Sequence, residues 1–193
     1  MFYLWLTFRC PELILEVSKI ADQSFIYDYP ILEFHYLDRK DLIFSEKVRF
    51  LCEHECEHYG HSWACPPAIG SIESCIKKCE KFSRAFLFAT IAQVEDSLNF
   101  EACLKARKEH EDLTLELRDR FRQEFGEVLA LSTGCMQCET CAYPNAPCRH
   151  PDKRVATVES HGILLMQTVE AMNICFNYGN DTVTYFTLLL FNA

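Results

Sequence analysis

The sequence predicts an α/β or α+β fold: a single domain over residues 1–193, with one sheet of about four strands flanked by helices and two cysteine-rich loops. Three observations support this prediction. Segments with a helical apolar period alternate along the chain with segments typical of strands. The chain has 193 residues, 49% of them hydrophobic, which is long enough to bury one sizeable core and short for two. Two stretches, residues 52–70 and 134–151, follow neither period and are rich in cysteine.

The first half of the chain contains two predicted helices and two predicted strands. Residues 10–23 ("CPELILEVSKIADQ") repeat apolar side chains at the spacing of a short amphipathic helix. Residues 31–38 ("ILEFHYLD") alternate, as in a half-buried strand. Ser71 can cap a helix over residues 71–82, with Glu73 in its first turn. Residues 84–94 ("RAFLFATIAQV") then predict a buried strand.

The second half repeats this alternation. Residues 97–125 predict the longest helix, ended by Gly126, with one apolar stripe made by Phe100, Leu104, Leu113, Leu117, Phe121 and Phe125. Residues 127–133 ("EVLALST") predict a buried strand that leads directly into the second cysteine-rich loop. A further helix is expected from about Gly162, with Gly179 as its stop, and residues 182–191 ("TVTYFTLLLF") predict the final strand.

The charge balance narrows the possible partners. The formal net charge is -9, from 28 acidic and 19 basic residues, which argues against nucleic acid or an anionic membrane as the partner. No apolar run reaches the roughly 20 residues of a membrane span. The opening "MFYLWLTFRCPE" lacks a basic segment before its apolar residues, so it is a poor signal peptide. We therefore expect a cytoplasmic protein whose partner is a small molecule or another protein.

The cysteines carry the main functional signal. The chain has 12 of them, and in a reducing cytoplasm such spacings more often indicate metal binding or catalysis than disulfides. In "GCMQCETCAYPNAPCRHP", Cys135, Cys138 and Cys141 follow one another in two-residue steps, and Cys148 comes after six more residues. Zinc usually takes two separated C-x-x-C pairs, whereas a 4Fe-4S cluster presents several iron corners to one wrapping loop. The spacing therefore favours a cluster over zinc.

The fourth ligand of this loop is less directly indicated. In two-cluster ferredoxins the fourth cysteine of the run is followed by proline and binds the other cluster. Here Arg149 and His150 stand between Cys148 and Pro151. We take Cys148 as the local fourth ligand. Arg149 is either a donor toward an anionic cluster or substrate, or a solvated surface arginine.

The earlier loop, "CEHECEHYGHSWACPPAIG", offers Cys52, Cys56 and Cys65 as ligands of a second metal or cluster. Cys52 and Cys56 can meet on one helical turn, and the proline pair after Cys65 fixes the backbone. We include Cys75 as the fourth candidate, while Cys79, a histidine, water or substrate are alternatives. An open position is typical of a catalytic or ligand-binding metal. Otherwise the loop holds a small structural metal or uncoordinated thiols.

Several further residues admit two interpretations. His54, His58 and His61 are possible ligands, although a polar loop explains them equally well. Tyr59 and Trp63 either cover the site or anchor the core. Glu159 is a helix cap, a partner of an arginine or a site acid, and His161 is equally ambiguous. Packing is the favoured role of the remaining cysteines, Cys10, Cys79, Cys103 and Cys175.

A family resemblance rests on these same motifs. The segments "YGHSWACPPAIGSIESC", "GCMQCETCAYPNAPCRHP" and "ESHGI", in that order, resemble a prokaryotic cysteine-rich family of predicted metal-binding proteins catalogued as a domain of unknown function. The resemblance covers nearly the whole chain from about Cys52 onward. It implies a cytoplasmic metal or iron-sulfur protein, with its ligands among Cys56, Cys65, Cys135, Cys138, Cys141 and Cys148.

Three functional hypotheses follow. The first is an iron-sulfur protein with one or two 4Fe-4S clusters, acting in electron transfer or as a redox accessory to a partner protein. The second is a zinc-binding structural or interaction module. The third is a metalloenzyme for a small anionic substrate near Cys65 and Arg149, and the sequence alone does not decide whether the protein is an enzyme.

Overall fold

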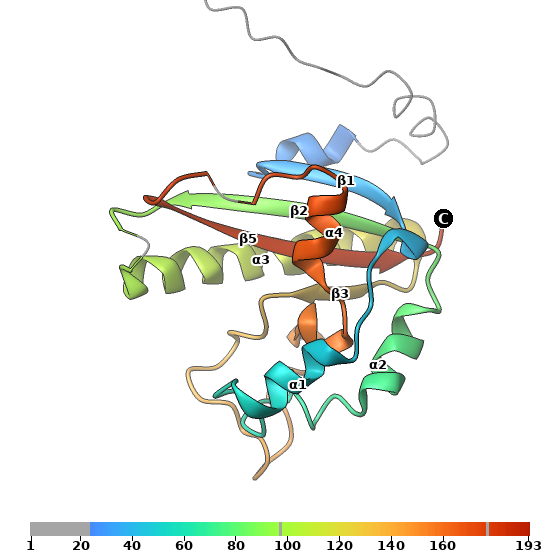
Figure 1. Ribbon diagram of the computed structural model, residues 1–193, viewed down its shortest axis with the longest axis vertical. Coiled ribbons are helices and arrows are strands. Elements are labelled where there is room, and N and C mark those ends of the chain that lie inside the picture. Colours follow the sequence, from blue (N-terminus) through green and yellow to red (C-terminus); the bar gives the residue numbers. More distant parts are fainter. Residues whose placement is uncertain (1–23, 97, 177) are drawn as a thin grey trace, which may run out of the picture.

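The computed structural model describes residues 24–96, 98–176 and 178–193. It has an α+β fold built on one mixed sheet in the strand order β1-β2-β5-β3-β4 (Figure 1). The strands are β1 (Glu33–Asp38), β2 (Arg84–Gln93), β3 (Leu129–Ser132), β4 (Ala156–Thr157) and β5 (Thr182–Phe191). Neighbouring strands are antiparallel except for the parallel pair β3 and β4. The predicted fold class is confirmed, and the sheet has one strand more than expected, since two-residue β4 is too short to show a period.

The core lies on both faces of the two long central strands. β2 and β5 pair over their whole length, and alternate side chains enter opposite layers. Phe86, Phe88 and Leu189 belong to one buried cluster, whereas Leu87 and Leu188 belong to the other. Both predicted strands are confirmed. They could be recognised from the sequence because a strand that is buried on both faces has a continuous run of apolar residues.

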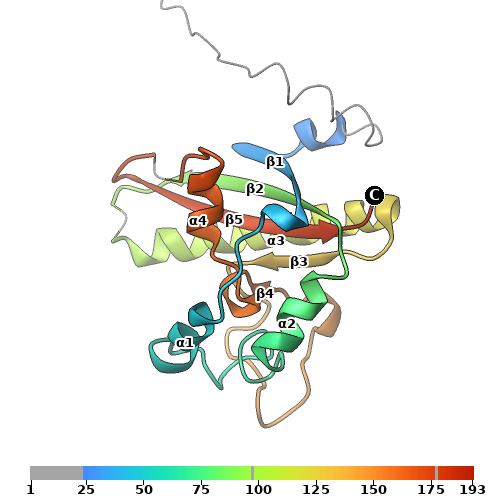
Figure 2. The same cartoon turned by 45° about the vertical axis from the view of Figure 1, so that its right-hand side comes forward.

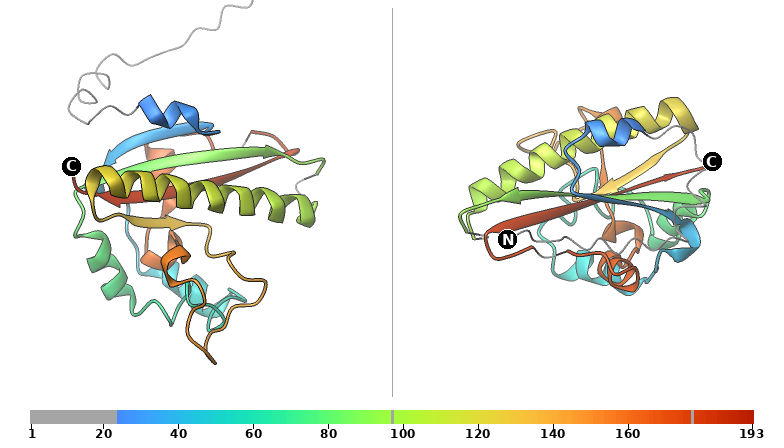
Figure 3. Two further views of the ribbon diagram at one scale, coloured as in Figure 1. Left: turned by 180° about the vertical axis from the view of Figure 1, so that it is seen from behind. Right: turned by 90° about the horizontal axis from the view of Figure 1, so that it is seen from above.

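One face of the sheet is covered by the long helix α3 (Phe100–Phe125), which lies along the strands in the left view of Figure 3. The Asn99 side chain caps its start by accepting from the Ala102 N–H group, and Gly126 ends it with φ at 80°. Leu117 and Phe121 of the predicted stripe are fully buried. The stripe prediction is wrong at Phe100, which is 74% exposed because it lies at the rim of a surface pocket instead of over the sheet.

The other face carries α1 (Lys47–His54), α2 (Ile72–Cys79), α4 (Leu165–Ala171) and a short 3-10 turn at Glu159–His161. Ser71 caps α2 as predicted, by accepting from the Ser74 N–H group. α1 was not predicted, and it overlaps the start of the stretch interpreted as a loop. α4 is shorter than predicted, because Gly162 adopts a left-handed conformation that ends the 3-10 turn, and Gly179 lies beyond the helix.

Two further expectations from the sequence concern the N-terminal segment and membrane-spanning helices. The helix predicted over residues 10–23 lies outside the described residues. Within the described ranges, no helix combines the length and the apolarity that crossing a bilayer requires.

Candidate metal centre

The two cysteine-rich loops lie side by side below the sheet, as Figures 2 and 3 show from two directions. Trp63 of the first loop joins them. Its backbone N–H donates to Cys141 Sγ at 3.4 Å, and its indole Nε1–H donates to the Ala146 carbonyl at 2.9 Å. Its ring also meets the ring of Tyr143 edge to face, with centroids 4.9 Å apart. The loops therefore form one folded region.

The four cysteines of the second loop line one small cavity. Cys135, Cys138, Cys141 and Cys148 all contribute to its wall, and residues 62–64 of the first loop complete it. Arg149, His150 and Arg154 also line it, and Arg149 Nη1 donates to the Thr140 carbonyl at 2.8 Å across the loop. The structure thus places the four cysteines that the spacing singled out around one cavity, and their joint binding of a metal stays a prediction.

The sulfur of Cys141 sits among hydrogen-bond donors. Burial raises the pKa of this thiol, but donors from the backbone of Tyr143, Trp63 and Ala142 and from the Ser62 side chain outweigh it, so the pKa is lowered. A lowered pKa favours the thiolate, which is the form that binds metal. For Cys135 the balance is opposite: burial raises the pKa more than the N–H group of Gln137 lowers it.

A buried carboxylate of α3 fixes the start of the second loop. Glu111, fully buried, accepts from the Met136 N–H at 2.6 Å and from Gln137 Nε2 at 3.1 Å. Two residues before Met136, Gly134 has φ at 105°, and a Cβ there would lie 3.2 Å from both Arg107 Nη2 and a methyl of Thr157. Side chains of α3 therefore set the path of the backbone as it enters the cysteine run.

The first loop spreads its three candidate ligands over a wider surface. Cys52 lies in the last turn of α1, and with Cys56 it lines an open pocket. Cys65 lines a cleft shared with Cys135, Cys138 and Cys141. Burial raises the pKa of Cys52 and of Cys65, and the neighbouring thiols add to the rise in both cases. Cys52 and Cys56 therefore line one pocket and Cys65 lines another.

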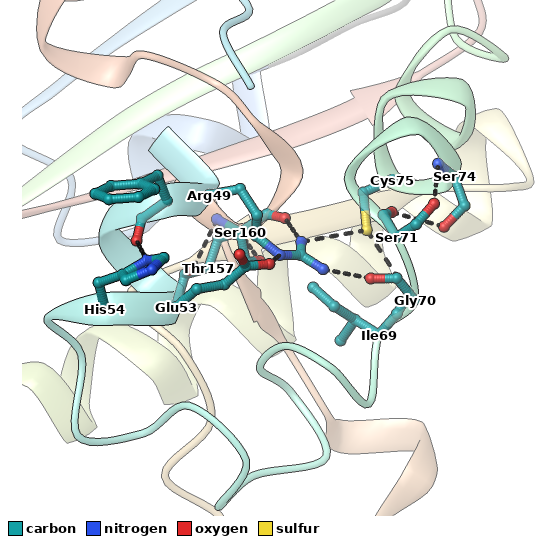
Figure 4. Close-up of polar contacts among 11 residues, drawn as sticks. Arg49, Glu53, His54, Ile69, Gly70, Ser71, Ser74, Cys75, Thr157 and Ser160 are labelled. Atoms are coloured by element: carbon teal, nitrogen blue, oxygen red, sulfur yellow. Dashed lines mark hydrogen bonds and ion pairs between the residues drawn. The ribbon is translucent and has the colours of Figure 1, made fainter. Parts of the chain in front are cut away.

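Cys75 is placed differently. It is fully buried on α2, with Sγ 3.7 Å from the Ile69 carbonyl and 4.0 Å from Arg49 Nη1 (Figure 4). It lines none of the cavities described above for the other candidate cysteines. Cys79 is fully buried in the core, as its interpretation as a packing residue predicted.

Arg49 ties the first loop to the rest of the protein. This side chain of α1 is only 5% exposed, and its guanidinium donates to the Ser160 carbonyl at 2.6 Å and to the Gly70 carbonyl (Figure 4). Glu53 lies 3.8 Å from Arg49 Nε. A single buried cation thus links α1, the end of the first loop and the 3-10 turn.

The remaining candidate residues, the histidines and Glu159, lie in different surroundings. His58 and His61 line the cleft between the loops, whereas His54 stacks on Phe50 and contacts its carbonyl. His161 is buried, and burial lowers its pKa to about 4. Glu159 lines the open pocket beside Cys52.

The donor chemistry fits a metal or cluster. Cysteine thiolates bind zinc and iron-sulfur clusters alike, and four of them line one cavity with N–H donors around one sulfur. In the parts of the chain that the structure describes, no three histidine, cysteine, aspartate or glutamate side chains are grouped so as to hold a metal ion.

Sequence reasoning missed the residues that position the loops. These residues lie on helices whose charged side chains are expected to face solvent, and they are Arg49, Arg107 and Glu111. No apolar pattern marks Glu111, because it shares its side of α3 with Thr114 and Arg118.

The sequence also matches a known family. A family model described as "Predicted metal-binding protein (DUF2284)" matches residues 35–191. No curated protein and no solved structure matches the chain.

Proposed function

Because the chain belongs to the DUF2284 family of predicted metal-binding proteins, we propose that it is an iron-sulfur protein with a 4Fe-4S cluster on Cys135, Cys138, Cys141 and Cys148. The observation that carries the proposal is the common cavity that these four side chains line. Three thiols in two-residue steps suit a cluster, because different iron corners accept them, whereas one zinc ion usually takes separated pairs. When bound, such a cluster supplies one-electron redox chemistry.

The surroundings of the cavity support an anionic group. N–H and O–H donors surround the Cys141 sulfur, and hydrogen bonds to cluster sulfurs are among the factors that set a reduction potential. Arg149 and Arg154 line the same cavity, so positive charge is available opposite the thiolates. These residues would hold the loop around the cluster and restrict access of water.

The first loop is proposed to hold a second metal or cluster on Cys52, Cys56 and Cys65, with a fourth position open. Cys75 stays a prediction, since its sulfur lies beside Arg49 and Ile69. The role that we propose is electron transfer to a protein partner in a reducing prokaryotic cytoplasm. The net charge of -9 supports a protein over nucleic acid as that partner.

Metal and sulfide analysis tests this proposal. Protein purified without oxygen is expected to contain about four irons and four acid-labile sulfides per chain, or about eight of each with a second cluster. Its visible absorption should bleach with dithionite. Zinc without sulfide would overturn the iron-sulfur assignment in favour of a zinc-binding structural module.

A pair of cysteine variants locates the cluster. Cys138→Ser should lose most iron and sulfide, because it removes one of the four thiols that line the cavity. Cys175→Ser is the matched control, since Cys175 is exposed and lines none of these cavities. Equal iron in both variants would exclude the Cys135 to Cys148 loop as the site.

A further inference from the structure

A large open pocket lies beside the first cysteine loop, and apart from Cys52 and Cys56 its lining residues have no role in the function proposed above. Its volume is about 700 Å³, within the range of roughly 300 to 1,000 Å³ that is usual for small-molecule sites. α1, the first half of α3 and the ends of three strands surround it, through the lining residues Val48, Leu51, Phe100, Leu104, Thr133 and Tyr185. It is therefore large enough for a molecule of drug-like size.

The pocket combines apolar walls with two carboxylates, of Glu55 and Glu159, that pair with no other side chain of the described residues. The walls come mainly from aliphatic and aromatic side chains, of which Leu51 is 58% exposed. Among the described residues, the Glu159 carboxylate makes no hydrogen bond or ion pair with another side chain. Glu159 stays exposed because it lines the open pocket, while the protein atoms packed around it raise its pKa by desolvation. A donor on a bound molecule can replace the water that solvates this exposed carboxylate with a charge-assisted hydrogen bond.

The one arginine of the pocket is already engaged. Arg107 Nε donates to Thr133 Oγ1 at 3.2 Å, and its Nη2 donates to the Thr133 carbonyl at 2.6 Å. Two acidic side chains, Glu55 and Glu159, line the pocket against this single arginine. The unused hydrogen-bonding groups of the pocket are therefore acceptors, and its acidic side chains outnumber its one arginine.

We propose that this pocket binds a small molecule with an apolar body and a cationic N–H donor group, an amine or an amidine, which donates to the Glu159 carboxylate. Charge-assisted hydrogen bonds of this kind are roughly twice as strong as neutral ones. The aromatic rings of Phe100 and Tyr185 on the pocket wall suit both an apolar body and a cation. The inference goes beyond the iron-sulfur proposal, because none of these contacts requires a metal.

The pocket adjoins the candidate second metal site. Cys52 and Cys56 line the same pocket, so a bound molecule lies against the first cysteine loop. A ligand there would touch the candidate second metal site directly, while the cavity of the second loop has a separate wall.

Binding of matched probes tests the proposal. Benzamidine and benzoate share a ring and differ in the charge of the polar group, so titration of each into the protein as purified, followed by NMR and calorimetry, compares the two. Benzamidine is expected to bind at least tenfold more tightly. Equal binding, tighter binding of benzoate, or no binding of either probe up to its solubility would overturn the proposal.

Variants test whether benzamidine binds in this pocket. Glu159→Gln should weaken benzamidine binding at least tenfold, and Leu51→Trp should abolish it by filling the pocket from an exposed position. Glu170→Gln, an exposed change on α4, is the control and should leave binding unchanged. Binding that survives both pocket variants would place the ligand elsewhere. Cys138→Ser should retain it, which separates this inference from the fate of the cluster.

Discussion

The sheet and the cysteine-loop region, residues 47–70 and 134–164, are held in place by contacts of different kinds. In the sheet, β2 and β5 bury large side chains on both faces, and Phe86, Leu188 and Phe121 are completely covered. In the cysteine-loop region, buried charged side chains bind backbone groups: Arg49 binds two carbonyls and Glu111 binds a backbone N–H. Apolar packing is non-directional and redundant, whereas each of these polar contacts is directional and joins one specific pair of groups.

This difference predicts where stability and metal binding reside. Changes in the sheet should lower the free energy of unfolding of the whole domain and leave metal content per folded chain intact. Changes in the cysteine-loop region should cost less in global stability and more in metal retention, because regions with few buried apolar contacts open locally.

The largest effect is expected from Phe121→Ala on α3. Phe121 is fully buried and packs against Phe86 and Phe191, with ring centroids 4.9 and 5.4 Å away. Removing the ring should lower the free energy of unfolding by about 3–5 kcal/mol. Urea denaturation measures this loss, and iron analysis of the folded fraction should be unchanged. Phe100→Ala, at an exposed position of the same helix, should cost little. A large loss of iron from folded Phe121→Ala would contradict the separation of the two regions.

The same contrast explains which parts of the structure could be predicted from the sequence alone. β2, β5, α3 and the Ser71 cap were predictable because their signals are local: a continuous apolar run, a repeated stripe and a capping serine. The assignment of Cys135 and Cys148 to one metal or cluster site rests on spacing and stays a prediction. The contacts of Arg49 with Ser160 and of Glu111 with Met136 were not, because they join residues far apart in the chain and no local pattern marks such partners.

The next largest effect is a pH dependence that originates in the sheet. His110 is buried between α3 and the central strands, where its nitrogens contact Thr90 and Thr187 hydroxyls at 2.7 and 2.9 Å. Burial lowers its pKa to about 4 from 6.5. Between these values the unfolded chain binds the proton that the folded chain does not, so stability falls as the pH drops from 6.5 to 4. At one pKa unit per 1.36 kcal/mol, the loss is about 3 kcal/mol by pH 4.

Two variants separate the contributions to this pH profile. His110→Gln keeps a polar side chain without a titrating ring, so its unfolding free energy should depend less steeply on pH over this window. His161, in the cysteine-loop region, has its pKa lowered to about 4 in the same way, so His161→Gln should flatten the profile as well. A profile unchanged in both variants would show that carboxylates alone cause the acid sensitivity.

A smaller effect is expected from Arg49→Met, which keeps the length of the side chain and removes its donors. The carbonyls of Ser160 and Gly70 would lose charged partners, so we expect a loss of about 2–3 kcal/mol. Hydrogen exchange should show faster opening of α1 and residues 60–70 than of β2. Arg49→Lys should be nearly as damaging, because one ammonium cannot replace a planar guanidinium that spans two carbonyls. Uniformly faster exchange throughout the sheet would show that Arg49 supports the whole domain.

The smallest change in stability is expected from Glu111→Gln, which is also the sharpest test of the comparison. The amide retains one acceptor oxygen but replaces the other with an NH₂ group, which faces a donor from Met136 or Gln137. We expect a cost of about 1–2 kcal/mol in unfolding free energy and clearly faster iron loss to a chelator.

Glu109→Gln, exposed on the same helix, is the control and should match the parent in both measurements. Because this carboxylate binds the backbone directly after Cys135, a small global cost with a large effect on iron retention would show that Glu111 anchors the proposed centre. Normal iron retention in Glu111→Gln would instead mean that the cluster and its four thiolates hold the loop in place without help from α3.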